Sequence, residues 1–404
     1  MPHQTNYPGL VADSSGPLHP PRRLLMGSGP SNPEPRVLQA MAAAPIAPDD
    51  PAYAALLDDV SSLARAVFQT ANMCTLAVPG ASRAGIEAVL ASLVEPGERV
   101  VVGVYGHFGE LLCTLAERHG ATVERVEAAE WGRPVRPEDI VTSVRRNPPK
   151  LVAIVHADTS TGILQPLEAV GEACRQTGTL FVVDAVLSLG GCELDVDGWS
   201  VDAAIGGMQK CLGGPPGLAP VTCSKVAVDA RARRSTLPHS AYLDLACLQA
   251  LWIGRQGLER AAMSTSMLLA AREALRIVTD EGLDARWERH RQMSRALRVG
   301  LEAMGLELFG DSAHKVPMIT LVHVPDGVDE AGVREQLLVQ HGVEIMAAFG
   351  PLRGRVWRIG TMGTNARLQS VLNVLAALEA VLAARGLRLP RGAAVDAALA
   401  AHSS

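Results

Sequence analysis

The chain has 404 residues, of which 48% are hydrophobic and 20% charged, so it can bury a large core and is not expected to be disordered. Its net charge of -5 and the lack of a strongly basic stripe argue against nucleic acid as a partner. No apolar run reaches the ~18 residues that a membrane span needs, which argues against a membrane protein.

The seven cysteines are scattered along the chain, odd in number and without a CxxC pair. This pattern is typical of a reduced protein without a zinc site. The N-terminus also lacks the apolar core of a secretory signal, so we expect a cytoplasmic protein that binds no metal.

In chain order, residues 1–23 are rich in Pro and Gly and are predicted to form a flexible arm. Residues 24–280 are predicted to form a large domain, in which short apolar runs alternate with helical patterns. The predicted strands are 73–78, 99–104, 121–126, 151–156, 180–184 and 201–206, and the predicted helices are 85–94, 110–119 and 166–177. Apolar strands separated by helices predict an α/β fold with a mostly parallel sheet, whose ligands bind beyond the carboxyl ends of the strands.

The pattern changes near residue 255, where long helices follow each other. The predicted helices are 264–281, 285–304, 329–341 and 366–385, and the predicted strands are 316–324, 343–347 and 355–360. This order predicts a smaller α+β domain over 281–385, followed by an Ala-rich tail over 386–404 that we expect to fray.

The segment AAIGGMQKCLGGPPG at 203–217 carries Gln209 and Lys210 from an apolar strand into a turn rich in Gly and Pro. A lysine near apolar surroundings has a lowered pKa and becomes a usable nucleophile. Glycines on both sides let a flat ligand approach the backbone closely. A solvated loop lysine is the alternative, and the local sequence leaves it open.

Two further segments place polar groups at strand ends. Asp184 ends the apolar run LFVVD, where a carboxylate is either a helix cap or a site residue. The turn PGASRAG at 79–85 joins a strand to a helix, and its free N–H groups together with Ser82 and Arg83 suit an anion such as a phosphate. An ordinary strand-to-helix turn is the alternative there.

Three other positions have two interpretations each. Phe108 opens a helix after a strand, where its ring either stacks on a ligand or packs in the core. Thr159, in HADTSTGILQP, has a hydroxyl that either meets a ligand or caps the next helix. Arg358, in the apolar segment VWRIGTMG, binds either a substrate carboxylate or an internal acidic partner, because a buried guanidinium is seldom left unpaired.

Together these segments resemble the class V aminotransferases, which are fold-type I enzymes that use pyridoxal 5′-phosphate (PLP). The matching segments, in family order from about Leu24 to Leu382, are LLMGSGPSNPEPRVLQAM, HADTSTGILQPL, VVDAVLSLGG, GMQKCLGGPPGLAPV and VWRIGTMG. Within the family, the chain resembles the alanine–, serine– and (S)-ureidoglycine–glyoxylate aminotransferases. The implied fold is a large domain with a mostly parallel seven-stranded sheet between helices, plus a smaller C-terminal α+β domain.

The resemblance implies a role for each candidate residue. Lys210 would carry PLP and move the proton at the substrate's α-carbon, and Asp184 would pair with the pyridine nitrogen. Arg358 would bind the α-carboxylates of the amino acid and the 2-oxo acid. The rest of the cofactor would contact Ala81, Ser82, Arg83 and Gln209 at the phosphate, Thr159 near the ring hydroxyl, and Phe108 and Val186 on the two ring faces.

The predicted function is a ping-pong aminotransferase that moves an amino group from a small amino donor to glyoxylate or a similar 2-oxo acid. The family also implies a homodimer with shared active sites. Pro48, Glu259 and Ala262 depart from the family pattern in the region where partner-subunit residues shape the substrate pocket. Another PLP reaction on the same scaffold, catalysed by a lyase, aldolase or decarboxylase, therefore stays open.

Overall fold

The computed structural model describes residues 20–255 and 263–403. Most of the predicted N-terminal arm lies outside the described residues, and so do Glu259 and Ala262.

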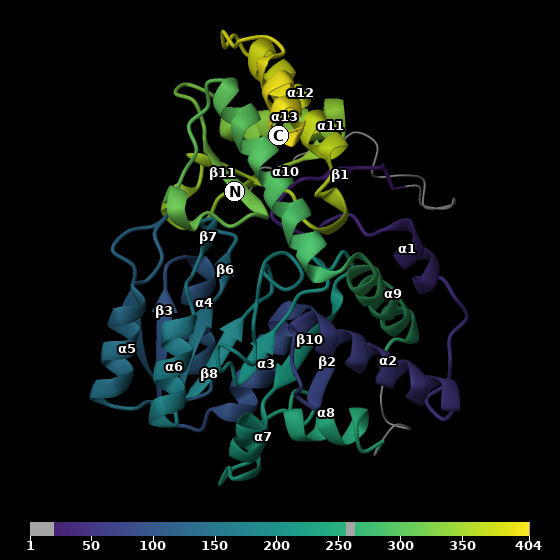
Figure 1. Cartoon of the computed structure of the whole chain (residues 1–404), viewed down its shortest axis with the longest axis vertical. Helices are drawn as coiled ribbons and strands as arrows, with labels where there is room; N and C mark the ends of the chain where they lie inside the picture. The colour runs from purple at the N-terminus through teal and green to yellow at the C-terminus, as the bar shows by residue number, and fades with distance from the viewer. Residues whose placement is uncertain (1–19, 256–262, 404) are drawn as a thin grey trace, which may run out of the picture.

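A seven-stranded sheet forms the centre of the lower half of the molecule (Figure 1). Its strand order is β2-β10-β9-β8-β5-β3-β4, and all neighbours run parallel except β10, which is antiparallel to both β2 and β9. The strands are β2 Cys74–Gly80, β3 Arg99–Val104, β4 Thr122–Glu127, β5 Leu151–Val155, β8 Leu180–Asp184, β9 Ala203–Ile205 and β10 Gly217–Cys223. The expected α/β fold with a mostly parallel sheet is therefore confirmed.

Helices flank this sheet and supply the rest of the first hydrophobic core. They are α1 Pro35–Met41, α2 Pro51–Phe68, α3 Ser82–Leu93, α4 His107–Arg118, α5 Pro137–Arg146, α6 Glu168–Thr177, α7 Lys225–Ala232, α8 Leu245–Trp252 and α9 Thr265–Glu281. The central strands β5 and β8 are buried along their whole length, which explains why both read as unbroken apolar runs. A short hairpin of β6 Ala157–Asp158 and β7 Ile163–Leu164 follows β5.

The upper half of the molecule is joined to the lower half by α10 Leu283–Ala303 (Figure 1). It has a second hydrophobic core around a three-stranded antiparallel sheet of order β11-β14-β13, and β1 pairs in parallel with β12 at its side. The elements are β1 Leu24–Leu25, β11 Ile319–His323, α11 Glu330–His341, β12 Val343–Glu344, β13 Met346–Ala347, β14 Val356–Gly360, α12 Leu368–Ala384 and α13 Ala393–Ser403, with single 3-10 turns at Ser312–His314, Gly350–Leu352 and Gly363–Asn365.

The expectation of a frayed tail is wrong. Helix α13 forms there and packs along α10, with Ala394 and Ala398 fully buried in the second core. The close approach depends on Gly300, because a Cβ on that residue would lie 2.9 Å from the carbonyl oxygen of Ala394. Across the described part of the chain, no helix is both long and apolar enough to cross a bilayer.

Candidate active site

All nine residues expected to hold a cofactor line one cavity of about 280 Å³. The cavity lies where β5 and β8 end and where α3 and α4 begin, as expected for a ligand site of a parallel sheet. The nine residues are Ala81, Ser82, Arg83, Phe108, Thr159, Asp184, Val186, Gln209 and Lys210.

Lys210 follows β9 and points into this cavity, where its amine donates a hydrogen bond to the carbonyl oxygen of Ser28. Burial lowers the pKa of Lys210 to about 8, and the nearby charge of Arg358 acts in the same direction. The amine fits there because residue 29 is glycine, since a Cβ at Gly29 would lie 2.4 Å from Lys210 Nζ. Lys210 is therefore held inside the cavity, and the alternative of a solvated loop lysine is wrong.

Lys210 also stands out among the four lysines of the chain. Lys150 forms an ion pair with Glu98, and Lys225 forms one with Asp229. Lys315 lies in a different cleft. A covalent lysine partner for a ligand in the 280 Å³ cavity is therefore Lys210.

Asp184 is the last residue of β8 and is buried, with Oδ1 accepting a hydrogen bond of 2.9 Å from the N–H of Val186. Burial raises the pKa of Asp184 to about 7, against the Val186 hydrogen bond, which lowers it. No helix lies between β8 and β9, a stretch that is described throughout, so the helix-cap interpretation of Asp184 is wrong. A cationic ring nitrogen placed in the cavity would stabilise this carboxylate in its ionised form.

The opposite end of the cavity suits an anion. Ser82 is the first residue of α3, and the residue before it, Ala81, provides no side-chain cap, so the helix N-terminus stays open. Gln209 Nε2 donates to Ser82 Oγ at 2.7 Å, while Gln209 Oε1 is buried and has no partner in the described part of the chain. Gly207 leaves room beside them, because a Cβ there would lie 2.9 Å from Ser82 Oγ.

Arg358 lies in β14 with only 3% of its surface exposed, next to but outside the lining of the cavity. Its Nε donates to the Ala347 carbonyl at 2.8 Å and its Nη1 to the Thr159 carbonyl at 3.2 Å. Within residues 20–255 and 263–403, no carboxylate forms an ion pair with Arg358, so an internal salt bridge is not its role. Burial lowers the pKa of Arg358 to about 10, which still leaves it charged near neutral pH.

Sequence reasoning missed the groups that hold these residues in place. Phe349 lies under Arg358, with the guanidinium carbon 4.4 Å from the ring centroid, and the His107 ring stacks on Phe349 at 4.5 Å. Asp158 is fully buried and accepts hydrogen bonds from the N–H of Phe108 at 3.2 Å and of Ser160 at 2.7 Å. The acidic position in HADTSTG was a visible signal for Asp158, whereas Phe349 had none, because its contact depends on how β13 and β14 pair.

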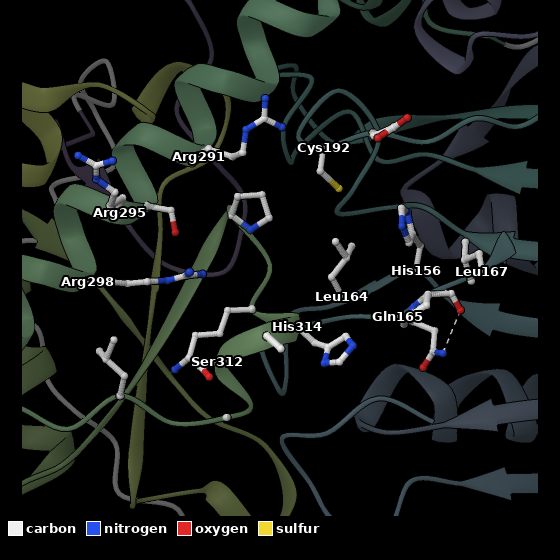
Figure 2. Close-up of a pocket in the computed structure, with 18 of the residues that line it drawn as sticks. His156, Leu164, Gln165, Leu167, Cys192, Arg291, Arg295, Arg298, Ser312 and His314 are labelled. Carbon is white, nitrogen blue, oxygen red and sulfur yellow. Dashed lines mark hydrogen bonds between the residues drawn. The ribbon is translucent and has the colours of Figure 1, made fainter. Parts of the chain in front are cut away.

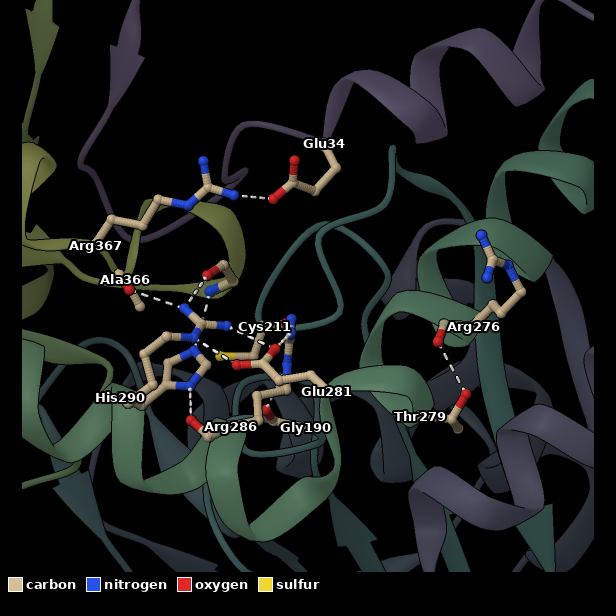
Figure 3. Close-up of polar contacts among 12 residues, drawn as sticks. Glu34, Gly190, Cys211, Arg276, Thr279, Glu281, Arg286, His290, Ala366 and Arg367 are labelled. Atoms are coloured by element: carbon tan, nitrogen blue, oxygen red, sulfur yellow. Dashed lines mark hydrogen bonds and ion pairs between the residues drawn. The ribbon is translucent and has the colours of Figure 1, made fainter.

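A buried polar network connects the two halves near the site (Figure 3). Arg286 donates to the carbonyls of Gly190 and Cys211, and Arg289 donates to those of Gly363 and Ala366. Both arginines form ion pairs with Glu281 at the end of α9. The network therefore fixes the backbone beside Lys210 against the turn that follows β14.

A lysine and a carboxylate at the carboxyl edge of a mostly parallel sheet, with an open helix N-terminus beside them, define the class of fold-type I PLP enzymes. The family model for aminotransferase class V matches residues 53–352, and the chain belongs to this family. It is a PLP-dependent transaminase.

Individual relatives agree with this family. The chain is 45% identical over 397 residues to the (S)-ureidoglycine–glyoxylate transaminase of Bacillus subtilis, covering 94% of this chain and 95% of the relative. It is 38% identical over 367 residues to the alanine–glyoxylate aminotransferase of Drosophila melanogaster, covering 90% and 93%. The crystal structure of ureidoglycine–glyoxylate aminotransferase from Bacillus subtilis superimposes with a TM-score of 0.94 at 47% identity, covering 96% of this chain and all of that one.

Proposed function

We propose that this chain holds PLP on Lys210 and transfers the amino group of a small amino acid to glyoxylate. The observation that carries this proposal is one cavity that combines Lys210, Asp184 and the open N-terminus of α3. The names of the relatives support glyoxylate as the acceptor, since the relatives from Bacillus subtilis and Drosophila melanogaster are both glyoxylate aminotransferases.

The residues present fit PLP at each end of its ring. Asp184 would hold the pyridine nitrogen, Ser82 and Gln209 would hold the phosphate at the N-terminus of α3, and Phe108 and Val186 would provide the two apolar walls. Gln209 Nε2 and the Ser82 hydroxyl already bond to each other, which places both groups at the N-terminus of α3. When bound, PLP supplies an electron sink for the carbanion that forms at the substrate's α-carbon.

Lys210 would take the proton from the substrate's α-carbon and pass it to the cofactor. Its pKa of about 8 leaves an appreciable fraction of neutral amine near neutral pH, which a general base requires. Arg358 would bind the α-carboxylate of the donor and then that of the acceptor, because two of its donors are fixed by carbonyl groups and the others remain available. The Phe349 ring beneath it keeps the guanidinium plane in place.

The test is a single-turnover reaction. PLP-loaded protein is mixed with alanine, serine, glycine or (S)-ureidoglycine, and conversion to pyridoxamine phosphate is followed by absorbance; glyoxylate should then restore PLP. Lys210→Ala should abolish both steps, whereas Lys225→Ala, at an exposed surface lysine, should leave them unchanged. Release of carbon dioxide or an aldehyde without pyridoxamine phosphate would instead establish a decarboxylase or aldolase.

We also propose a cytoplasmic homodimer. All seven cysteines are free, which agrees with a reducing compartment. The segment 42–48, which contains Pro48, is apolar yet mostly exposed, and this favours a partner surface there. Sedimentation equilibrium that gives the mass of a monomer at micromolar concentration would contradict the dimer.

A further inference from the structure

The described structure has a second cavity that is larger than the proposed active site. It is a cleft of about 1240 Å³ (Figure 2). One wall is formed by α10 and the segment before β11, and the other by the residue after β5 and the start of α6. None of the expected cofactor residues lines it. Its volume exceeds the ~300–1,000 Å³ typical of small-molecule sites, so space is available for an organic ligand.

Three buried polar atoms from residues that line this cleft have no hydrogen-bond partner among residues 20–255 and 263–403: His156 Nδ1, Ser294 Oγ and Arg298 Nε. His156 and Ser294 are 2% and 1% exposed. Ser294 and Arg298 are four residues apart on α10, so they lie on the same face of the helix. Unsatisfied buried polar atoms are destabilising, so the walls of this cleft contain polar groups that the fold alone does not satisfy.

The acidic and basic residues that line the cleft differ in how deeply they are buried. Glu168, Glu193, Glu302 and Glu307 line it but are all exposed. Arg298 and Lys315 are more deeply placed, and burial lowers the pKa of Arg298 to about 10 and lowers the pKa of Lys315 as well. Their hydrogen bonds go to the carbonyl oxygens of Val316 at 2.6 Å and Phe309 at 2.9 Å. Glu302 attracts both charges and Asp311 attracts that of Lys315, but within the described residues no carboxylate forms an ion pair with either cation. Arg298 and Lys315 can therefore still bind an anion directly.

The remaining walls are apolar. Leu164 and Val299 line the cleft from opposite sides, and the Trp199 ring stands edge-on against the His156 ring at 5.6 Å. Burial lowers the pKa of His156 to about 3, so its ring is neutral and offers a hydrogen bond rather than a charge. Such a lining suits a ligand with an oxyanion at one end and a flat or apolar body.

We propose that this cleft is a second ligand site, separate from the active site, which binds an organic oxyanion with its carboxylate or phosphate on Arg298 and Lys315 and its body against Trp199 and His156. Both kinds of oxyanion share the chemistry that a guanidinium and an ammonium recognise. Arg291 and Arg295, which also line the cleft, are exposed and bond to Glu288 and to the Ala401 carbonyl. They are therefore assigned no direct role.

The test is isothermal titration calorimetry on the PLP-loaded protein with phenyl phosphate and with benzoate, and with benzyl alcohol as the neutral control. At least one of the two anions should bind saturably, and the stronger of them identifies the preferred oxyanion. Arg298→Met should weaken binding tenfold or more, which is the loss of one charge-assisted contact. Arg291→Met removes the same charge from an exposed arginine of the same helix that is already paired with Glu288, so it should change binding less than threefold.

Arg358→Met separates this cleft from the active site. Binding at the cleft should survive Arg358→Met and be lost in Arg298→Met, whereas binding at the substrate site would show the reverse and overturn the proposal. Failure of both anions to bind the parent protein would overturn it as well. Arg298→Met should also keep or raise Tm, because it removes a buried charge without an ion pair; a lower Tm with unchanged anion binding would assign Arg298 a purely structural role.

Discussion

Replacing Arg358 with lysine tests whether its bonds serve substrate binding. A guanidinium has five N–H donors, and two of them are already used on the carbonyls of Ala347 and Thr159. The donors that remain can bind a carboxylate bidentately while the plane rests on Phe349. A lysine ammonium offers a point charge that cannot hold both carbonyls and a two-point carboxylate contact. The expected loss is about 2–4 kcal/mol, so kcat/KM should fall by about 30- to 1000-fold in both half-reactions.

The assay is stopped-flow absorbance of each half-reaction, with Tm measured on the same samples. Arg355→Lys is the matched control, because Arg355 lies in the same segment but is exposed. PLP affinity should be unchanged in Arg358→Lys, since Arg358 does not line the cofactor cavity. A clear drop in Tm with nearly normal kinetics would refute the reasoning and make the arginine a structural residue that joins β13 to the segment after β5.

Asp184→Asn should slow amino-group transfer by at least 30-fold, and in the cofactor-free protein it should raise Tm more at pH 8 than at pH 5. The folded pKa of Asp184 is raised to about 7 from 3.8, so the folded state binds more protons between these values and the parent loses stability as pH rises through them; equal Tm differences at both pH values would contradict this. Ser82→Ala should weaken PLP affinity roughly tenfold in a fluorescence titration, and an unchanged affinity would move the phosphate away from α3. Glu281→Gln should lower the free energy of unfolding by roughly 2 kcal/mol, because it leaves Arg286 buried without its ion pair; urea denaturation that gives the parent value would show the pair to be dispensable.

The part of the site on the large sheet could be predicted from the sequence. A buried parallel strand reads as an unbroken apolar run, and its carboxyl end marks the ligand edge, so Asp184 at the end of β8 was placed correctly from LFVVD. The predicted bounds 99–104 and 180–184 match β3 and β8. Glycine-rich turns likewise marked where Ser82 and Lys210 face the cavity.

Features that depend on packing between distant segments could not be predicted. Strand β10 contains Pro220, which argues against a central strand because proline cannot donate to a ladder. The sequence of helix α13 does not predict an ordered helix, since its stability comes from packing against α10. Phe349 lies nine residues before Arg358, and only the hairpin of β13 and β14 brings its ring under the guanidinium.

Lys210 lies in the half of the molecule with the first hydrophobic core, and Arg358 lies in the half with the second. The distance between them therefore depends on the junction between α9 and α10, which we call the elbow. Arg286 holds the carbonyl of Cys211, the residue after Lys210, while Arg289 holds the turn that follows β14 and Arg358. Glu281 bonds to both arginines, and although burial would raise its pKa, their hydrogen bonds and charges lower it overall, which keeps the carboxylate ionised. His290, kept neutral because burial lowers its pKa to about 3, accepts the N–H of Gly363 on the same turn. Because Cys211 directly follows Lys210 and Gly363 lies five residues after Arg358, we expect these bonds at the elbow (Figure 3) to help set the distance between the amine and the guanidinium.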